Sequence, residues 1–218
     1  MAGFKFSKEC FRTLSEYFFR FVLWIFLAPR YQLTVIDREK LPIDGPAFIV
    51  SNHESYLDGL IVALVSRKWA RFLVDWIYYR LPVFKQICRW IRAIPIAPQK
   101  VNQEVLKRAY ETISESLANG EVIAIFPEGW VTRDGGVAPF KRGIEKMLER
   151  NPAPVTPVAI TGLWGSVFSR EGGKVFLKRP KYLMRRRKVT IRVGDSIPPD
   201  KASAEHLRET IEKLKKSA

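Results

Sequence analysis

Cysteine and histidine are both scarce in this chain of 218 residues, which contains two of each. Cys10 and Cys88 lie far apart, belong to no CxxC pair and have no histidine at a metal-ligand spacing. The sequence therefore offers neither a disulfide framework nor a zinc-binding signature. We expect no metal ion and no bound cofactor, and the two cysteines fit a reducing, cytosolic-side location.

The chain also lacks an apolar run long enough to cross a bilayer. Its N-terminal apolar stretch, from Tyr17 to Ala28, is interrupted by Arg20 and closed by Pro29, whereas a spanning helix needs roughly 20 apolar residues. We expect residues 1–30 to form a helix that becomes apolar on nearly all sides toward its end. A buried core helix is one interpretation, but phenylalanine and tryptophan beside arginine favour a membrane-associating helix at the interface.

Acidic residues are few relative to basic ones. Lys and Arg total 37 against 22 Asp and Glu, which gives a formal net charge of +15. This charge implies an anionic partner, and nucleic acid, an acidic lipid leaflet or a phosphorylated substrate would each satisfy it. RNP, KH and helix-turn-helix signatures are missing, so nucleic acid is not expected as the partner.

A basic run without any acidic residue lies between Gly172 and Lys188. It is either a solvated hairpin or a contact with acidic lipid, to which each base near the surface contributes about 1 kcal/mol. With the N-terminal helix, it predicts a peripheral or monotopic protein on the cytoplasmic face of an anionic membrane. The run comprises Lys174, Lys178, Arg179, Lys181, Arg185, Arg186, Arg187 and Lys188.

Short β-like runs alternate with helical segments from Tyr31 onward. This alternation is typical of an α/β domain in which helices flank a central sheet. We expect a single domain over residues 31–218 with a mixed, largely parallel sheet, because no repeat or linker marks a second one. The predicted strands are 33–36, 47–50, 72–74, 122–126, 155–160 and 189–193, and the predicted helices follow residue 58 and cover 83–91, 102–118, 140–149 and 204–215.

A polar segment, residues 51–59 (SNHESYLDG), directly follows one predicted strand. That places His53 at the carboxyl end of the strand, where open α/β sheets have their active sites. If the loop turns into a helix near Tyr56, the Asp58 carboxylate folds back onto the imidazole and orients it. The other ring nitrogen is then free to take a proton from a substrate hydroxyl. The plainer interpretation is a helix N-cap region with a hydrogen-bonded histidine.

A second motif, Phe126-Pro127-Glu128-Gly129, also comes directly after a strand-like run. Two strand-end loops that carry His, Asp and Glu indicate one shared site. In this order the motifs resemble those of the glycerophospholipid acyltransferase family, which includes 1-acylglycerol-3-phosphate acyltransferases. Residues 52–58 match its NHxxxxD motif and 126–129 its FPEG motif, while 140–143 and 155–158 resemble its later Phe-Lys-x-Gly element and Pro-containing strand.

The resemblance implies an enzyme that moves a fatty acyl group from a thioester to a hydroxyl of a lysophospholipid or glycerol phosphate. His53 would be the general base and Asp58 its partner, and Glu128, Gly129 and Lys141 would contribute to the acceptor phosphate site. The thioester, acyl-CoA or acyl carrier protein, would be a co-substrate. The hydroxyl would attack it directly, with no acyl-enzyme. Glu128 has an alternative role, which is to hold a loop.

One departure from the family pattern concerns the residues after FPEG. Many members continue with Thr-Arg-Ser, whereas this chain reads Trp130-Val131-Thr132-Arg133. The candidate phosphate-binding Arg133 thus comes two positions late, although its guanidinium suits bidentate contact with phosphate oxygens. This longer form is similar to domains that acylate lysophosphatidylethanolamine, so the acceptor has either a bare phosphate or a larger head group.

Two other functions fit parts of the sequence. A basic nucleic-acid-binding protein would explain the charge, but not the apolar N-terminal helix or the two loops with acidic residues. A thioesterase or phospholipase is the nearest enzymatic alternative, because a histidine base also activates water. The chain lacks a Gly-x-Ser-x-Gly elbow, which argues against a covalent serine mechanism.

Overall fold

A computed structural model describes residues 8–172 and 186–217 of the chain. Of the predicted basic run, Lys174, Lys178, Arg179, Lys181 and Arg185 lie outside these residues.

A seven-stranded sheet with the order β1-β7-β6-β2-β5-β3-β4 forms the centre of the described structure. Strand β7 runs antiparallel to β6, and all other neighbouring strands are parallel. The predicted mixed, largely parallel α/β sheet is therefore confirmed. The strands are β1 (Tyr31–Ile36), β2 (Ala47–Ser51), β3 (Ala70–Asp75), β4 (Ile94–Ile96), β5 (Val122–Ile125), β6 (Val155–Thr161) and β7 (Arg187–Val193).

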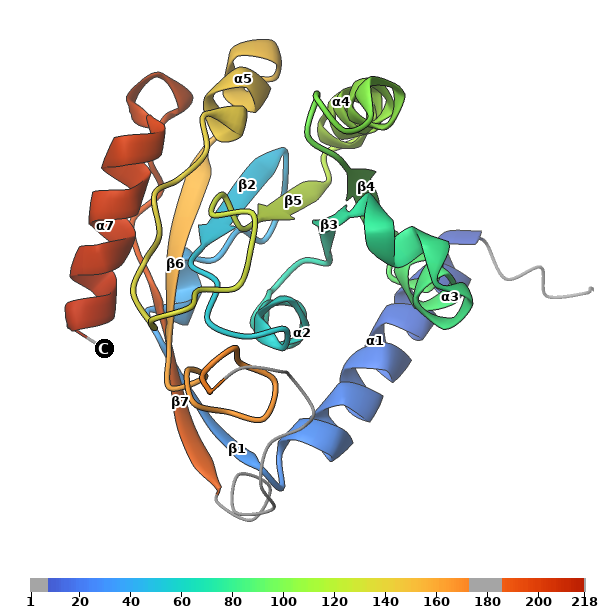
Figure 1. The fold of residues 1–218 in the computed structure, drawn as a ribbon. Helices are drawn as coiled ribbons and strands as arrows, with labels where there is room; N and C mark the ends of the chain where they lie inside the picture. Colours follow the sequence, from blue (N-terminus) through green and yellow to red (C-terminus); the bar gives the residue numbers. More distant parts are fainter. Residues whose placement is uncertain (1–7, 173–185, 218) are drawn as a thin grey trace, which may run out of the picture.

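Helices cover both faces of this sheet (Figure 1). Alternate residues of β2 point to opposite faces, so Ile49 packs with α1 and α2, while Phe48 and Val50 pack with α4, α5 and α7. The helices are α1 (Lys8–Leu27), α2 (Asp58–Val65), α3 (Pro82–Trp90), α4 (Gln103–Ala118), α5 (Gly143–Arg150) and α7 (Ala204–Lys216), with 3₁₀ turns η1 (Arg38–Lys40), η2 (Trp76–Arg80) and η3 (Pro199–Lys201).

The edge strand β4 is the one described strand that the sequence pattern missed. It has only three residues, with Pro95 in the middle, and among the described strands it pairs with β3 alone. Proline lacks a backbone N–H and is tolerated at a sheet edge, where one side of the strand needs no partner. The run is too short and too proline-rich to show the alternation that indicates a strand.

Helix α5 begins later than predicted, at Gly143 rather than near Phe140. The reason is a tertiary hydrogen bond, because the Lys141 N–H donates to the Pro127 carbonyl at 2.9 Å. That bond ties the Phe-Lys element to the loop after β5 and holds residue 141 outside the helix.

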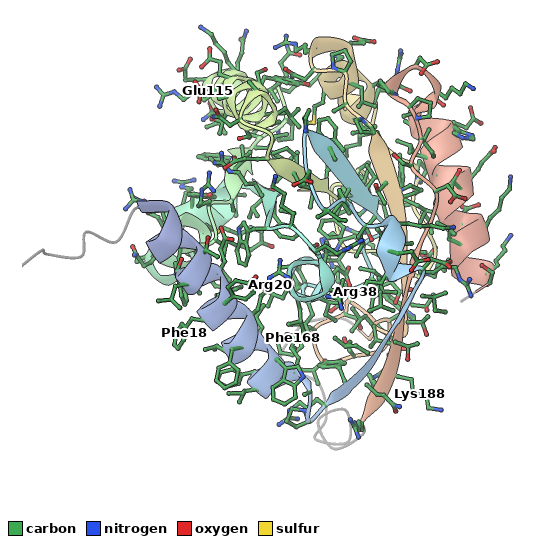
Figure 2. All side chains as sticks on the ribbon, turned by 180° about the vertical axis from the view of Figure 1, so that it is seen from behind. Phe18, Arg20, Arg38, Glu115, Phe168 and Lys188 are labelled. Atoms are coloured by element: carbon green, nitrogen blue, oxygen red, sulfur yellow. The ribbon has the colours of Figure 1, made fainter. Side chains whose placement is uncertain are left out.

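Helix α1 has a buried and an exposed apolar side. Phe19, Leu23 and Leu27 pack in the core, and the Phe19 ring meets the Trp69 and Trp90 rings edge-on at centroid distances of 5.6 and 5.1 Å. Figure 2 shows Phe18 pointing away from the body of the protein. The other exposed apolar side chains of this helix are Leu14, Tyr17, Phe21, Trp24, Ile25 and Phe26.

Core packing and membrane contact are thus compatible for α1, because they use different sides of the helix. None of the described helices is both long enough and apolar enough to cross a membrane. The membrane contact of the outer side stays a prediction.

Candidate active site

The two polar motifs meet at the carboxyl edge of the sheet. Strands β2 and β5 are parallel neighbours, so the segments that follow them start side by side. The His53 ring, which follows β2, stacks on the Phe126 ring, which follows β5, with 4.5 Å between centroids and 22° between planes. The packing of parallel strands therefore joins the two motifs that the sequence separates.

His53 and Asp58 form a close pair. The His53 Nδ1 atom lies 2.7 Å from the Asp58 Oδ2 atom, and the Asp58 side chain is fully buried while that of His53 is 19% exposed. Asp58 is the first residue of α2, and its Oδ2 atom also accepts the Ser55 N–H at 2.8 Å. An ionised carboxylate only accepts hydrogen bonds, so the shared hydrogen belongs to Nδ1 and the Nε2 lone pair is left for chemistry.

Burial dominates the electrostatics of Asp58. It raises the pKa of this carboxyl group, and the hydrogen bond and charge of His53, followed by the Ser55 N–H, act in the opposite direction. The carboxylate therefore depends on the histidine for its stabilisation, and the imidazole depends on the carboxylate for its orientation. Such an arrangement allows an imidazole to accept a proton while the carboxylate keeps the ring in one orientation.

Glu128 holds the main chain of His53. The His53 N–H donates to Glu128 Oε1 at 2.8 Å, and the Ala138 N–H donates to Oε2 at 3.0 Å. The Thr132 N–H donates to the His53 carbonyl at 2.8 Å. The Glu128 carboxylate is fully buried and bonded through both oxygens, which is the loop-holding role. Direct contact of Glu128 with substrate stays a prediction.

The buried position of Glu128 gives a pH-dependent stability prediction. Burial raises its pKa from 4.5 to about 7, against the opposing hydrogen bonds from Ala138 and His53. Between these two values the folded protein holds a proton that the unfolded chain has released, so this group's contribution to stability is fully present below pH 4.5 and falls as the pH rises toward 7. The loss is on the order of 3 kcal/mol, because one pKa unit corresponds to about 1.4 kcal/mol.

We expect Glu128→Gln to flatten that part of the pH dependence in chemical denaturation. The NH₂ group of the amide also points at one of the two backbone N–H donors, which lowers the free energy of unfolding by about 1–3 kcal/mol at low pH. The matched control is Glu209→Gln at an exposed position, and its stability should depend on pH as that of the unmodified protein does. If the stability of Glu128→Gln still falls between pH 4.5 and 7, Glu128 is not the group responsible for the pH dependence.

Two buried polar residues that the sequence analysis did not single out complete the scaffold. Asn52 binds both polar groups of one β6 residue, since its Nδ2 donates to the Ile160 carbonyl at 2.9 Å and its Oδ1 accepts the Ile160 N–H at 2.8 Å. Glu54 accepts the N–H groups of Leu163 and Trp164, each at 3.0 Å. The His53 loop is therefore fastened to β6 and the segment after it.

A lysine from the C-terminal helix neutralises Glu54. The Lys215 Nζ atom lies 2.6 Å from Glu54 Oε1 and donates to the Gly135 carbonyl at 2.6 Å. It thus bridges the loop after β2 and the loop after β5. Asn52 and Glu54 flank His53 in a polar segment, and this position is the sequence signal that could have identified them. No local pattern points to Lys215.

The predicted phosphate-binding residues lie in the second motif and in the segment after it. Gly129 has a φ of 74°, and a Cβ atom there would lie 2.3 Å from the Lys141 Nζ atom. The same ammonium group lies 4.4 Å from the centre of the Trp130 ring. Gly129 and Lys141 are therefore brought together, and the absence of a side chain at 129 leaves room for the lysine.

Arg133 lies in the neighbouring loop and is exposed. It follows Thr132, which is bonded to the His53 carbonyl. Among the described residues its guanidinium has no ion-pair partner. The loop lines a pocket of about 280 Å³ that is open to solvent, formed by Trp130, Thr132, Arg133, Asp134, Val137, Ala138 and Pro139.

Comparisons with known proteins bear on this site. The acyltransferase family model matches residues 32–161. The chain is 29% identical over 166 residues to a putative 1-acyl-sn-glycerol-3-phosphate acyltransferase of Caenorhabditis elegans, covering 76% of this chain and 55% of the relative. It is 28% identical over 206 residues to a 1-acyl-sn-glycerol-3-phosphate acyltransferase of Chlamydomonas reinhardtii, covering 92% and 58%. The chain thus spans little more than half the length of these relatives.

A solved structure shares the fold. The crystal structure of the 1-acyl-sn-glycerophosphate acyltransferase PlsC from Thermotoga maritima has a TM-score of 0.68 and 21% identity, over 96% of this chain and 78% of that one. The matched family segment contains both motifs, which the structure gathers at one edge of the sheet. The chain belongs to the acyltransferase family.

Proposed function

We propose that this protein transfers a fatty acyl group from a thioester to the free hydroxyl of a 1-acylglycerol-3-phosphate or a related lysophospholipid. The observation that carries the proposal is the His53–Asp58 pair, 2.7 Å apart, with a buried carboxylate and a partly exposed imidazole. The names of the relatives support the substrate class, since those described above are 1-acyl-sn-glycerol-3-phosphate acyltransferases.

In the proposed reaction, His53 Nε2 removes the proton of the acceptor hydroxyl while its oxygen attacks the thioester carbonyl carbon. The new C–O bond forms, and the resulting oxyanion collapses as the C–S bond breaks. The thiolate leaves with the proton that His53 had accepted, so the imidazole returns to its starting state. Asp58 stabilises the transient imidazolium and keeps the ring in one orientation.

The acceptor phosphate would bind to the positive groups that follow the second motif. Lys141 and Arg133 supply the charge, and the missing side chain of Gly129 leaves the space that the Lys141 ammonium occupies. Hydrogen bonds from Arg or Lys to phosphate are stronger than those between neutral groups, and an arginine binds two phosphate oxygens at once. The donor would be acyl-CoA or acyl carrier protein.

The proposed location is the cytoplasmic face of a membrane. The outer side of α1, with Phe18, Phe21 and Trp24, would enter the interface of an anionic leaflet. A peripheral position of this kind would give the site access to an acceptor that stays in the bilayer.

Arg133 and Lys141 compete for the phosphate role, and kinetics separates them. If Arg133 binds the phosphate, Arg133→Ala should raise the acceptor KM by the equivalent of about 1.5–3 kcal/mol, the loss of a charged hydrogen bond, while the donor KM stays near normal. Arg133→Lys should recover only part of this loss, because an ammonium makes no two-pronged contact. Lys146→Ala, on the exposed side of α5, is the control.

The opposite result has a clear meaning. An acceptor KM that is unchanged in Arg133→Ala and raised in Lys141→Ala would move the phosphate site to the Lys141 element.

Mass spectrometry of the products from a panel of lysophospholipids and glycerol phosphate, each with both thioester donors, tests the proposed substrate class. The proposal expects a diacyl product from lysophosphatidate, and its absence with every acceptor would refute it.

A further inference from the structure

Apolar side chains are exposed on a second segment besides α1. The segment consists of η2 and α3, residues 76–90, which follow β3. Five of its apolar side chains are between 40% and 52% exposed: Ile77, Leu81, Phe84, Ile87 and Trp90. Large apolar side chains that cluster on one surface, rather than scatter singly, mark an interaction site.

The sequence of α3 divides the helix into an apolar and a basic side. Phe84, Ile87 and Trp90 recur at three-residue spacing, and the buried Cys88 adjoins them on the side that faces the protein. Lys85 and Arg89 lie on the other side and are exposed. A helix with an open apolar strip and a basic strip is typical of segments that lie in a membrane interface.

Charge supports a lipid partner for this segment. Arg80 in η2 lies with its guanidinium carbon 5.3 Å from the centre of the Trp76 ring, so a basic group adjoins the apolar side chains of η2, and α3 carries Lys85 and Arg89. The chain as a whole carries +15. Basic groups beside apolar ones match an anionic leaflet, where head groups bind the charges and acyl chains receive the apolar side chains.

The position of the segment relates it to the active site. Strand β3 is parallel to β5, so η2 starts from the same sheet edge as the loops that hold His53 and Glu128. Tyr78 of η2 is hydrogen-bonded to Tyr56 of the His53 loop. The ring of Trp90, at the end of α3, lies edge-on to the ring of Phe19 of α1, with 5.1 Å between the ring centroids. The segment therefore connects the catalytic edge with α1, and Figure 1 shows α3 beside that helix.

We infer that η2 and α3 form a second lipid-docking surface, which holds the sheet edge with His53 against an anionic bilayer. The inference rests on the proposed function for the lipid acceptor, but the binding it predicts is measured without acyl transfer. One helix alone would fix the protein to the leaflet and leave its rotation free. Contacts through both α1 and α3 would fix the orientation of the active site as well.

Flotation of the full chain with phosphatidylcholine vesicles, with and without phosphatidylglycerol, tests this surface. Ile87→Ser and Phe84→Ser/Ile87→Ser are the test variants. Ile43→Ser is the matched control, because Ile43 is 56% exposed and precedes β2, at the opposite edge of the sheet. We expect the double variant to lower vesicle affinity about tenfold, since each side chain loses part of its transfer free energy, and the control to bind like the unmodified protein.

A charge-reversal pair keeps the test independent of any packing effect. Lys85→Glu/Arg89→Glu should lose binding to the anionic vesicles and leave the weaker binding to neutral vesicles unchanged. Lys107→Glu/Lys146→Glu, on α4 and α5 over the other sheet face, is its control. Thermal unfolding of each variant establishes that the fold is intact.

Three outcomes overturn the inference. The first is equal vesicle binding by the Phe84→Ser/Ile87→Ser and Ile43→Ser proteins. The second is loss of binding only in an α1 variant such as Phe18→Ser. The third is unchanged vesicle binding together with lost binding of acyl carrier protein in solution, which would make the segment a protein-docking surface. If the variants bind vesicles less tightly but the unmodified protein acylates no lysophospholipid, the proposed function is refuted and the docking surface is retained.

Discussion

His53→Ala should lower kcat for acyl transfer by a factor on the order of 10²–10⁴, the usual contribution of a positioned general base. Alanine leaves the acceptor hydroxyl without a group to take its proton, while Arg133 and Lys141, the proposed phosphate-binding residues, are unchanged. The acceptor KM should therefore stay near that of the unmodified enzyme. Steady-state kinetics at saturating donor measures both parameters.

The chain supplies its own control for this substitution. Its other histidine, His206, lies on the exposed surface of α7, so His206→Ala should retain full turnover. His53→Ala also leaves the Asp58 carboxylate buried without its partner, so thermal unfolding must show that the variant is folded at the assay temperature. More than about a tenth of normal turnover in a folded His53→Ala protein would remove His53 from the role of base.

Asp58→Asn is expected to be nearly as damaging, again by about 10²–10⁴ in kcat. The neutral amide cannot stabilise the imidazolium that forms as the hydroxyl proton is transferred, and its NH₂ group favours the wrong orientation of the ring. Because the two residues act as a unit, the double variant His53→Ala/Asp58→Asn should be no slower than His53→Ala alone. Additive losses would mean that Asp58 acts independently of His53.

The stability of Asp58→Asn provides a separate measurement. Burial raises the pKa of Asp58, so ionisation of this carboxyl opposes folding, and its contribution to stability falls as the pH rises through the folded-state value. Asparagine does not ionise. Chemical denaturation of Asp58→Asn should therefore show a stability that no longer falls as the pH rises through the range in which Asp58 ionises, whereas the exposed Asp200→Asn should keep the profile of the unmodified protein.

The central part of the site could be predicted from local sequence, for physical reasons. Both motifs directly follow buried strands, and the carboxyl ends of neighbouring parallel strands meet at one edge. The five-residue separation of His53 and Asp58 spans one loop and the first turn of α2, so the pairing of the two side chains follows from local sequence, although distant residues such as Glu128 hold the loop in place. Six of the seven described strands were predictable because they are short β-like runs, whereas β4 is too short to show such a pattern.

The supporting contacts could not be predicted in the same way. Asn52 binds Ile160, which is 108 positions along the chain, and Lys215 reaches Glu54 from the C-terminal helix. Such pairs depend on tertiary packing, and nothing in the local pattern encodes them. Helix α1 illustrates another limit, because an apolar sequence shows neither which side enters the core nor which side stays exposed.

In the proposed reaction the acyl group goes to a lipid hydroxyl and not to water. The most direct test of this transfer uses an isotopically labelled acyl thioester, lysophosphatidate and the full chain on anionic vesicles, with thiol release and labelled products measured together. We expect one labelled phosphatidate for each thiol released, and we expect this product to depend on the acceptor and to be lost in His53→Ala but not in His206→Ala. Labelled free fatty acid, formed at the same rate with and without lysophosphatidate, would contradict it.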